Sequence, residues 1–216
     1  MIWHARFAAI AAVLFAAPAW AGGVSITVSD SHGTPIADAV VALISDSQMA
    51  LPESRVPASA IIDQRHEMFI PLVSLIRKGG HVTFTNNDTT MHQVYSFSVI
   101  RQFQFEIDQG QHSKPVIFDE AGIAPIGCNI HDQMITYVYV ASSPFTALTD
   151  AKGHAQFSDV PDGAYHAIAW HPQLAPGTPT PTRPVMTSSA NVAVTMEIPL
   201  LAGPKPGTAH MHMGGY

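Results

Sequence analysis

The sequence predicts an all-β protein, and three observations carry that prediction. Apolar and polar residues alternate over short runs, Gly, Asn, Asp or Pro clusters bound each run, and no segment shows a long amphipathic helical pattern. In chain order, the predicted strands cover residues 24–28, 39–44, 81–85, 93–99, 102–107, 134–140 and 190–200.

Two polar or proline-rich stretches interrupt the predicted strands. Residues 45–57 contain Pro52 and Pro57 and are predicted to form a connector. Residues 171–184 contain five prolines, which favours an extended surface loop rather than a strand.

The two ends of the chain differ from the rest. Residues 1–21 combine an early Arg6, an apolar run over 7–17 and the small-x-small sequence Ala19-Trp20-Ala21, which is typical of a secretory signal peptide. The apolar run is shorter than the roughly 20 residues that a membrane span requires, so no membrane anchor is expected. Residues 202–216 are predicted to be a disordered tail. Its His210-Met211-His212-Met213 run is either a weak copper-binding segment or a chance feature.

The charge balance gives no support for nucleic-acid binding. The formal net charge is -6 at pH 7. Loss of a leader carrying Arg6 makes the charge one unit more negative, whereas nucleic-acid binding requires a basic stripe.

The only cysteine is the most informative single residue. In an oxidising compartment, Cys128 has no internal partner with which to form a disulfide. His131 and Met134 follow it at the third and sixth positions, and thiolate, imidazole and thioether are ligands that suit copper. His92 is an upstream candidate for a second imidazole. Two alternatives stay open: a buried, inert Cys128, and a zinc site, which gains nothing from the thioether.

Several motifs resemble those of the cupredoxins, the blue-copper family, in its amicyanin and plastocyanin type. They are Met68-Phe69-Ile70-Pro71, the run over 80–86, Met91-His92, and Cys128 with His131 and Met134. The resemblance covers residues 59–141. It implies a Greek-key β-sandwich that holds one type 1 copper ion through His92, Cys128, His131 and Met134.

The flanking residues resemble a carboxypeptidase regulatory-like, transthyretin-like β domain in the runs over 30–41 and 149–165. The cupredoxin is then inserted in a second β-sandwich. The expected division is a signal peptide (1–21), the first part of the regulatory-like domain (22–50), the cupredoxin domain (51–143), the second part of the regulatory-like domain (144–201) and the tail (202–216).

These resemblances imply a periplasmic electron carrier rather than an enzyme. Its partners are expected to be a dehydrogenase donor and a cytochrome-like acceptor. The predicted electron port is His131, surrounded by an apolar docking patch that consists of Ala124, Pro125, Ile126, Ile130 and Met134. The alternative is a protein that stores or delivers copper without passing electrons.

Overall fold

The computed structural model describes residues 22–201, so the predicted signal peptide and the predicted tail lie outside the described residues. Within this range the chain forms sixteen strands arranged in four sheets, and the all-β prediction is confirmed. A search of the same residues for a helix long and apolar enough to cross a membrane finds none.

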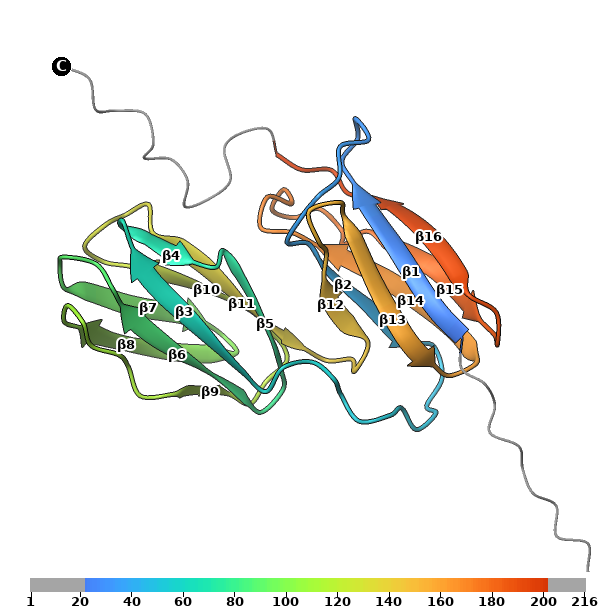
Figure 1. Cartoon of the computed structure of the whole chain (residues 1–216), viewed down its shortest axis with the longest axis horizontal. Coiled ribbons are helices and arrows are strands. Elements are labelled where there is room, and N and C mark those ends of the chain that lie inside the picture. Colours follow the sequence, from blue (N-terminus) through green and yellow to red (C-terminus); the bar gives the residue numbers. More distant parts are fainter. Residues whose placement is uncertain (1–21, 202–216) are drawn as a thin grey trace, which may run out of the picture.

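One pair of sheets is built from both ends of the described chain, and we call it the flanking sandwich (Figure 1). Its smaller sheet has the order β13-β1-β16, and its larger sheet has the order β12-β2-β14-β15. The strands are β1 (Gly22–Ser29), β2 (Val40–Ser45), β12 (Thr146–Leu148), β13 (His154–Val160), β14 (Gly163–Trp170), β15 (Thr182–Thr187) and β16 (Val192–Glu197).

The other pair of sheets comes from residues 59–141, and we call it the central sandwich. Its sheets have the orders β5-β11-β10-β7-β8 and β4-β3-β6-β9. The strands are β3 (Ser59–Arg65), β4 (Met68–Ile70), β5 (Val73–Arg77), β6 (Gly80–Asn86), β7 (His92–Ser98), β8 (Arg101–Ile107), β9 (Val116–Phe118), β10 (Gly122–Cys128) and β11 (Ile135–Ala141).

The alternating sequence produces the burial of each sandwich. Successive side chains of a strand point to opposite faces of the sheet, so alternate residues of β1 and of β6 are buried. Each sandwich has an apolar core of its own. The flanking core includes Ile26, Leu43 and Tyr165, and the central core includes Phe84, Ile126 and Val138.

The two sandwiches pack against each other through a third apolar cluster. Val40 and Val56 contact residues of β5 there, and Trp170 of the flanking sandwich packs against this cluster. The Trp170 ring lies 5.6 Å from the ring of Tyr137 and 5.8 Å from the ring of Tyr139, measured between centroids. The orientation of the central sandwich is therefore held by side-chain packing as well as by the two connecting segments.

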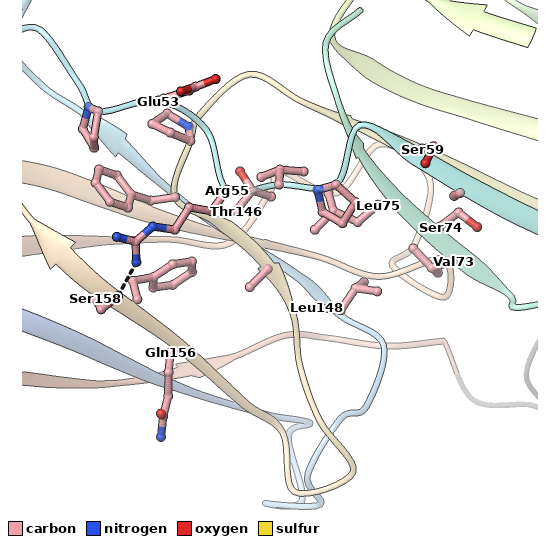
Figure 2. A pocket seen from close by; sticks show the side chains of 18 of the residues that line it. Glu53, Arg55, Ser59, Val73, Ser74, Leu75, Thr146, Leu148, Gln156 and Ser158 are labelled. Atoms are coloured by element: carbon pink, nitrogen blue, oxygen red, sulfur yellow. Dashed lines mark hydrogen bonds between the residues drawn. The ribbon is translucent and has the colours of Figure 1, made fainter. Parts of the chain in front are cut away.

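A cleft of about 550 Å³ lies beside this contact, between the connector and the edges of both sandwiches (Figure 2). Arg55 lies at its rim and donates hydrogen bonds to Ser158 and to Asp159, both at 2.8 Å. Its lining is mostly apolar and includes none of the predicted copper ligands.

One sequence prediction is wrong in part. The last three residues of the loop expected over 171–184 belong to β15 (Thr182–Thr187), with Pro184 opposite His166. β15 is the outermost strand of its sheet, and an edge strand tolerates proline because its outer N–H groups need no partner in the sheet. The proline content therefore marked an edge rather than the absence of a strand.

Candidate metal centre

Three of the four predicted ligands meet at one end of the central sandwich. His92 is the first residue of β7 and Cys128 is the last residue of β10, and these strands pair antiparallel with Cys128 opposite Val94. His131 lies in the turn between β10 and β11. The start of one strand, the end of its neighbour and the following turn therefore bring two imidazoles and a thiol together.

The geometry of these three side chains suits a metal ion. One ligand atom from each of His92, Cys128 and His131 lies within 4.8 Å of the other two. Cys128 Sγ and His92 Nδ1 are 3.6 Å apart. Metal–nitrogen and metal–sulfur bonds of about 2.0 and 2.3 Å place two ligand atoms of one ion at most about 4.3 Å apart, so this pair can share an ion.

The burial of the cluster also fits a metal ion. His92 is fully buried and Cys128 is 3% exposed. His131 Nδ1 is buried and has no hydrogen-bond partner among the described residues. A buried polar atom without a partner costs about 1–3 kcal/mol, and an ion bound at His131 Nδ1 would remove that cost. Two imidazoles, a thiol and the nearby Met134 thioether form a cluster of the type 1 copper kind.

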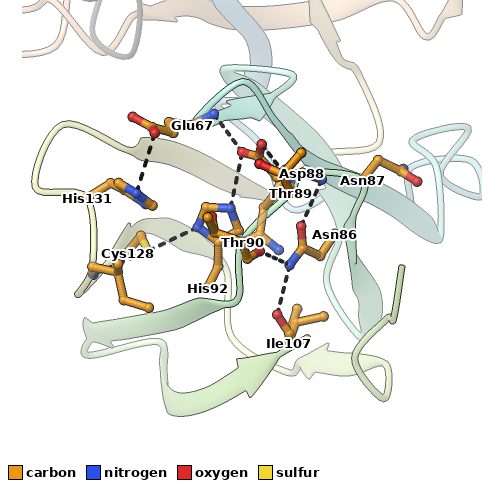
Figure 3. A network of polar contacts seen from close by, with 12 residues as sticks. Glu67, Asn86, Asn87, Asp88, Thr89, Thr90, His92, Ile107, Cys128 and His131 are labelled. Carbon is orange, nitrogen blue, oxygen red and sulfur yellow. Dashed lines mark hydrogen bonds and ion pairs between the residues drawn. The ribbon is translucent and has the colours of Figure 1, made fainter. Parts of the chain in front are cut away.

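A carboxylate orients the upstream imidazole, as Figure 3 shows. Asp88 Oδ2 lies 3.2 Å from His92 Nε2, which leaves Nδ1 directed at Cys128. A proton on Nε2 frees the Nδ1 lone pair for a metal, and such outer hydrogen bonds fix the tautomer of a ligand histidine.

The pKa values of this pair follow from burial and hydrogen bonding. Burial lowers the pKa of His92 from its ordinary value of 6.5, although the bond to Asp88 opposes that change. Burial alone would raise the pKa of Asp88, but hydrogen bonds from the Glu67 and Thr89 amides and the contact with His92 outweigh it, so this pKa is lowered. At neutral pH, a neutral imidazole therefore faces a carboxylate, which is the state that a metal ligand requires.

Asn86 braces the loop that precedes His92, a role that was not predicted from the sequence. Its side-chain amide donates hydrogen bonds to the carbonyls of Thr90 and Ile107, each at 2.8 Å, and its carbonyl accepts the Asp88 amide at 2.9 Å. Asn86 is 1% exposed. The signal available in the sequence was a polar residue at the end of an alternating strand, two residues before Asp88.

The segment that carries Cys128 is braced from the neighbouring strand. The Asn129 amide donates to the Gln93 backbone carbonyl at 3.0 Å, and the Asn129 side chain donates to Gln93 Oε1 at 2.7 Å. The Ile130 amide lies 3.5 Å from Cys128 Sγ and donates to it. Gly127 allows the close approach of Tyr95, whose hydroxyl oxygen would lie 2.6 Å from a Cβ at this position.

Met134, the fourth predicted ligand, is buried at 2% exposure in the same apolar cluster as Cys128. Its amide donates to the His131 carbonyl at 3.0 Å, which closes the turn between β10 and β11. The residue is thus held beside the cluster, and its role as the axial ligand remains a prediction.

The predicted docking patch is wrong for three of its five residues. Ala124, Ile126 and Met134 are 0–2% exposed, because β10 turns alternate side chains into the core and Met134 closes the turn beneath it. Pro125 and Ile130 are exposed, and the His131 side chain is 22% exposed.

Comparisons with known proteins find similarity only among solved structures. No family model matches the sequence, and neither does any curated protein. A purple cupredoxin from Nitrosopumilus maritimus is 25% identical and aligns over 38% of this chain and 99% of its own, with a TM-score of 0.35. An amicyanin variant in its reduced state is 17% identical and aligns over 48% of this chain and 99% of its own, with a TM-score of 0.35.

A third match aligns over only a small part of the solved protein. A copper-containing nitrite reductase from Thermus scotoductus is 19% identical over 45% of this chain but only 24% of its own length, with a TM-score of 0.35. The aligned parts span about half of this chain or less. The transthyretin-like resemblance of the flanking residues stays a prediction.

Proposed function

We propose that the protein is a blue-copper electron carrier in which the central sandwich holds one type 1 copper ion. The observation that carries this proposal is the convergence of His92 Nδ1, Cys128 Sγ and His131 Nδ1, which has no partner among residues 22–201, at one buried end of the sandwich. A thiolate and two imidazoles with a weak thioether form the ligand set of blue-copper electron-transfer sites.

Each ligand side chain has a separate task. His92 and Cys128 belong to paired strands, so their positions change little when the charge of the site changes. His131 is the most exposed of the three and forms the route for electrons to and from the surface. Met134 would add its thioether as a further, weak ligand. When bound, copper supplies a centre that gains and loses one electron.

The hydrogen bonds that hold the ligands in place favour an electron carrier over a copper-storage protein. Asn86 and Asp88 fix the upstream ligand, and the Gln93–Asn129 pair fixes the downstream one. A delivery protein needs ligands that can be released to an acceptor, whereas a carrier gains from ligands that are held in one geometry. Export to the periplasm, a dehydrogenase donor and a cytochrome-like acceptor belong to this proposal and rest on the sequence.

Copper addition to the metal-free protein tests the proposal. We expect strong visible absorption from thiolate-to-copper charge transfer at one copper per chain, and reversible one-electron cycling at an electrode. A colourless Cu(II) form would contradict the type 1 site. A coloured form that loses its copper to a chelator within minutes would favour the storage or delivery alternative.

A further inference from the structure

The exposed edge of His131 faces a carboxylate that the metal site itself does not need. Glu67 Oε1 lies 3.7 Å from His131 Nε2, on the side of the ring away from the cluster, and Figure 3 shows this placement. The Glu67 side chain is 50% exposed. A partner that approaches the exposed edge of His131 therefore meets the charge of Glu67.

The position of Glu67 is fixed by the backbone. His66 and Glu67 both have φ of 55° and form the tight turn between β3 and β4. Two consecutive residues with positive φ are characteristic of a type I′ hairpin turn, which usually contains Asn or Gly rather than His and Glu. The Glu67 amide donates to Asp88 Oδ2 at 2.7 Å, so the carboxylate that orients His92 also anchors this turn.

The charge of Glu67 is not cancelled by a basic side chain. Among the described residues, no Lys or Arg forms an ion pair with Glu67. Arg65, on the same hairpin, pairs instead with Asp63 at 3.1 Å. Asp132, the residue after His131, is exposed and adds a second negative charge beside the port.

We propose that Glu67 is a specificity-determining residue that selects redox partners with a positively charged docking face. This inference rests on the proposed electron-carrier function. The partner is a one-electron carrier that brings Lys or Arg side chains against Glu67 while its redox centre approaches His131. Opposite charges at such a contact raise the association rate and orient the encounter, and like charges exclude wrong partners.

Two small oxidants of opposite charge test the inference without a natural partner. The copper protein is reduced and then mixed with cationic tris(phenanthroline)cobalt(III) or with anionic hexacyanoferrate(III). In each reaction one electron leaves the reduced copper site, the oxidant gains that electron, and no proton is transferred. For Glu67→Gln at low ionic strength, we expect about 3- to 10-fold slower oxidation by the cation and faster oxidation by the anion.

Opposite changes in the two oxidation rates would distinguish an effect of charge on partner selection from a general effect on the copper site. A change in reduction potential alters the driving force for both oxidants in the same direction, so voltammetry and the pair of rates together distinguish the two causes. Glu67→Asp keeps the charge and is expected to restore most of the preference. At about 1 M salt, where the screening length is about 3 Å, the difference should vanish.

A matched control removes the same charge elsewhere. Glu120 pairs with Lys78 just before the start of β10, whereas Cys128 lies at the end of that strand. Glu120→Gln should leave both rates nearly unchanged. The inference is overturned if Glu67→Gln alters neither rate or alters both in one direction. If the wild-type protein shows no thiolate-to-copper absorption, the proposed function and this inference both fall.

Discussion

The two sandwiches differ in one group of buried polar side chains, although buried hydroxyls satisfy the backbone in both, as Thr136 Oγ1 of the central sandwich does by donating to the Pro71 carbonyl at 2.9 Å. In the flanking sandwich, buried hydroxyls satisfy the backbone. Thr149 Oγ1 donates to the Ile36 carbonyl at 2.7 Å and accepts the Ala39 amide at 3.0 Å, and Ser143 Oγ donates to the Leu43 carbonyl at 2.6 Å. In the central sandwich, His92, Cys128 and His131 direct ligand atoms toward one another.

The difference indicates which of two similar cores holds the functional site. Buried polar groups are normally paired, so a buried group without a partner needs an explanation. Thr149 closes a loop and needs no ligand. His131 Nδ1 has no partner among the described residues, and it lies beside a thiol and a second imidazole. This contrast can be tested by substitution in each sandwich.

Removal of the thiol should abolish the site while the fold survives. We expect Cys128→Ala to lose all thiolate-to-copper absorption, because no other described sulfur can supply a thiolate. Loss of one small buried side chain should cost about 1–2 kcal/mol of unfolding free energy. Optical titration with copper and chemical denaturation measure the two effects. Residual visible absorption at full intensity would show that Cys128 is not the ligand.

A large truncation in the flanking core should destabilise the fold but leave the copper site unchanged. Phe157 is 7% exposed within the flanking core. Phe157→Ala should lower the free energy of unfolding by about 3–5 kcal/mol. The absorption spectrum of the folded, copper-loaded variant should match that of the wild type. A changed spectrum would mean that the two cores are coupled more tightly than their separate packing indicates.

A pair of buried polar substitutions compares the two sandwiches directly. Asn86→Ala leaves the carbonyls of Thr90 and Ile107 without a donor, and Thr149→Ala leaves the Ala39 amide without an acceptor. Each loss should destabilise the fold by about 2–3 kcal/mol. Only Asn86→Ala should also change the electron paramagnetic resonance spectrum of the copper form, because only it loosens the loop before His92. Equal spectral changes in both variants would remove the contrast.

The contact between the sandwiches can be weakened without touching either core. Trp170→Ala removes the ring that packs on Tyr137 and Tyr139, and since Trp170 is only partly buried we expect a loss of about 2 kcal/mol. The variant should also show faster proteolysis of the segment between β2 and β3, residues 46–58. Trp170→Phe, which keeps an aromatic ring, serves as the control. An unchanged stability would indicate that the connecting segments alone hold the two sandwiches.

Acid should weaken the metal-free central sandwich modestly. Burial lowers the pKa of His92 below 6.5, so the unfolded chain binds a proton at a higher pH than the folded chain does. The stability that this group contributes is present above about pH 6.5 and is lost as the pH falls below it. Thermal unfolding of the copper-free protein between pH 8 and pH 5 measures the slope. His92→Gln should flatten it, and an unchanged slope in this variant would show that His92 is not its source.

Local patterns in the sequence were enough for much of the fold. Alternation located β1, β2, β6, β7, β8, β11 and β16 to within a few residues. The other nine strands of the described residues escaped it, including β3, β13 and β14, which have seven or eight residues and no proline. β10 contains Pro125 and β15 contains Pro184, and proline obscures a strand whose place in the sheet is not known.

The chemistry of the candidate ligands follows from the sequence alone. Cys128, His131 and Met134 lie within seven consecutive residues at the end of β10 and in the turn after it, so a short stretch of sequence contains all three. Only the tertiary structure decided that His92 meets Cys128, that Asp88 and Asn86 hold His92, and that Glu67 faces His131. The physical reason is that side-chain type and backbone alternation are local. By contrast, the neighbours of a ligand depend on strand order and register, which join residues far apart in the chain.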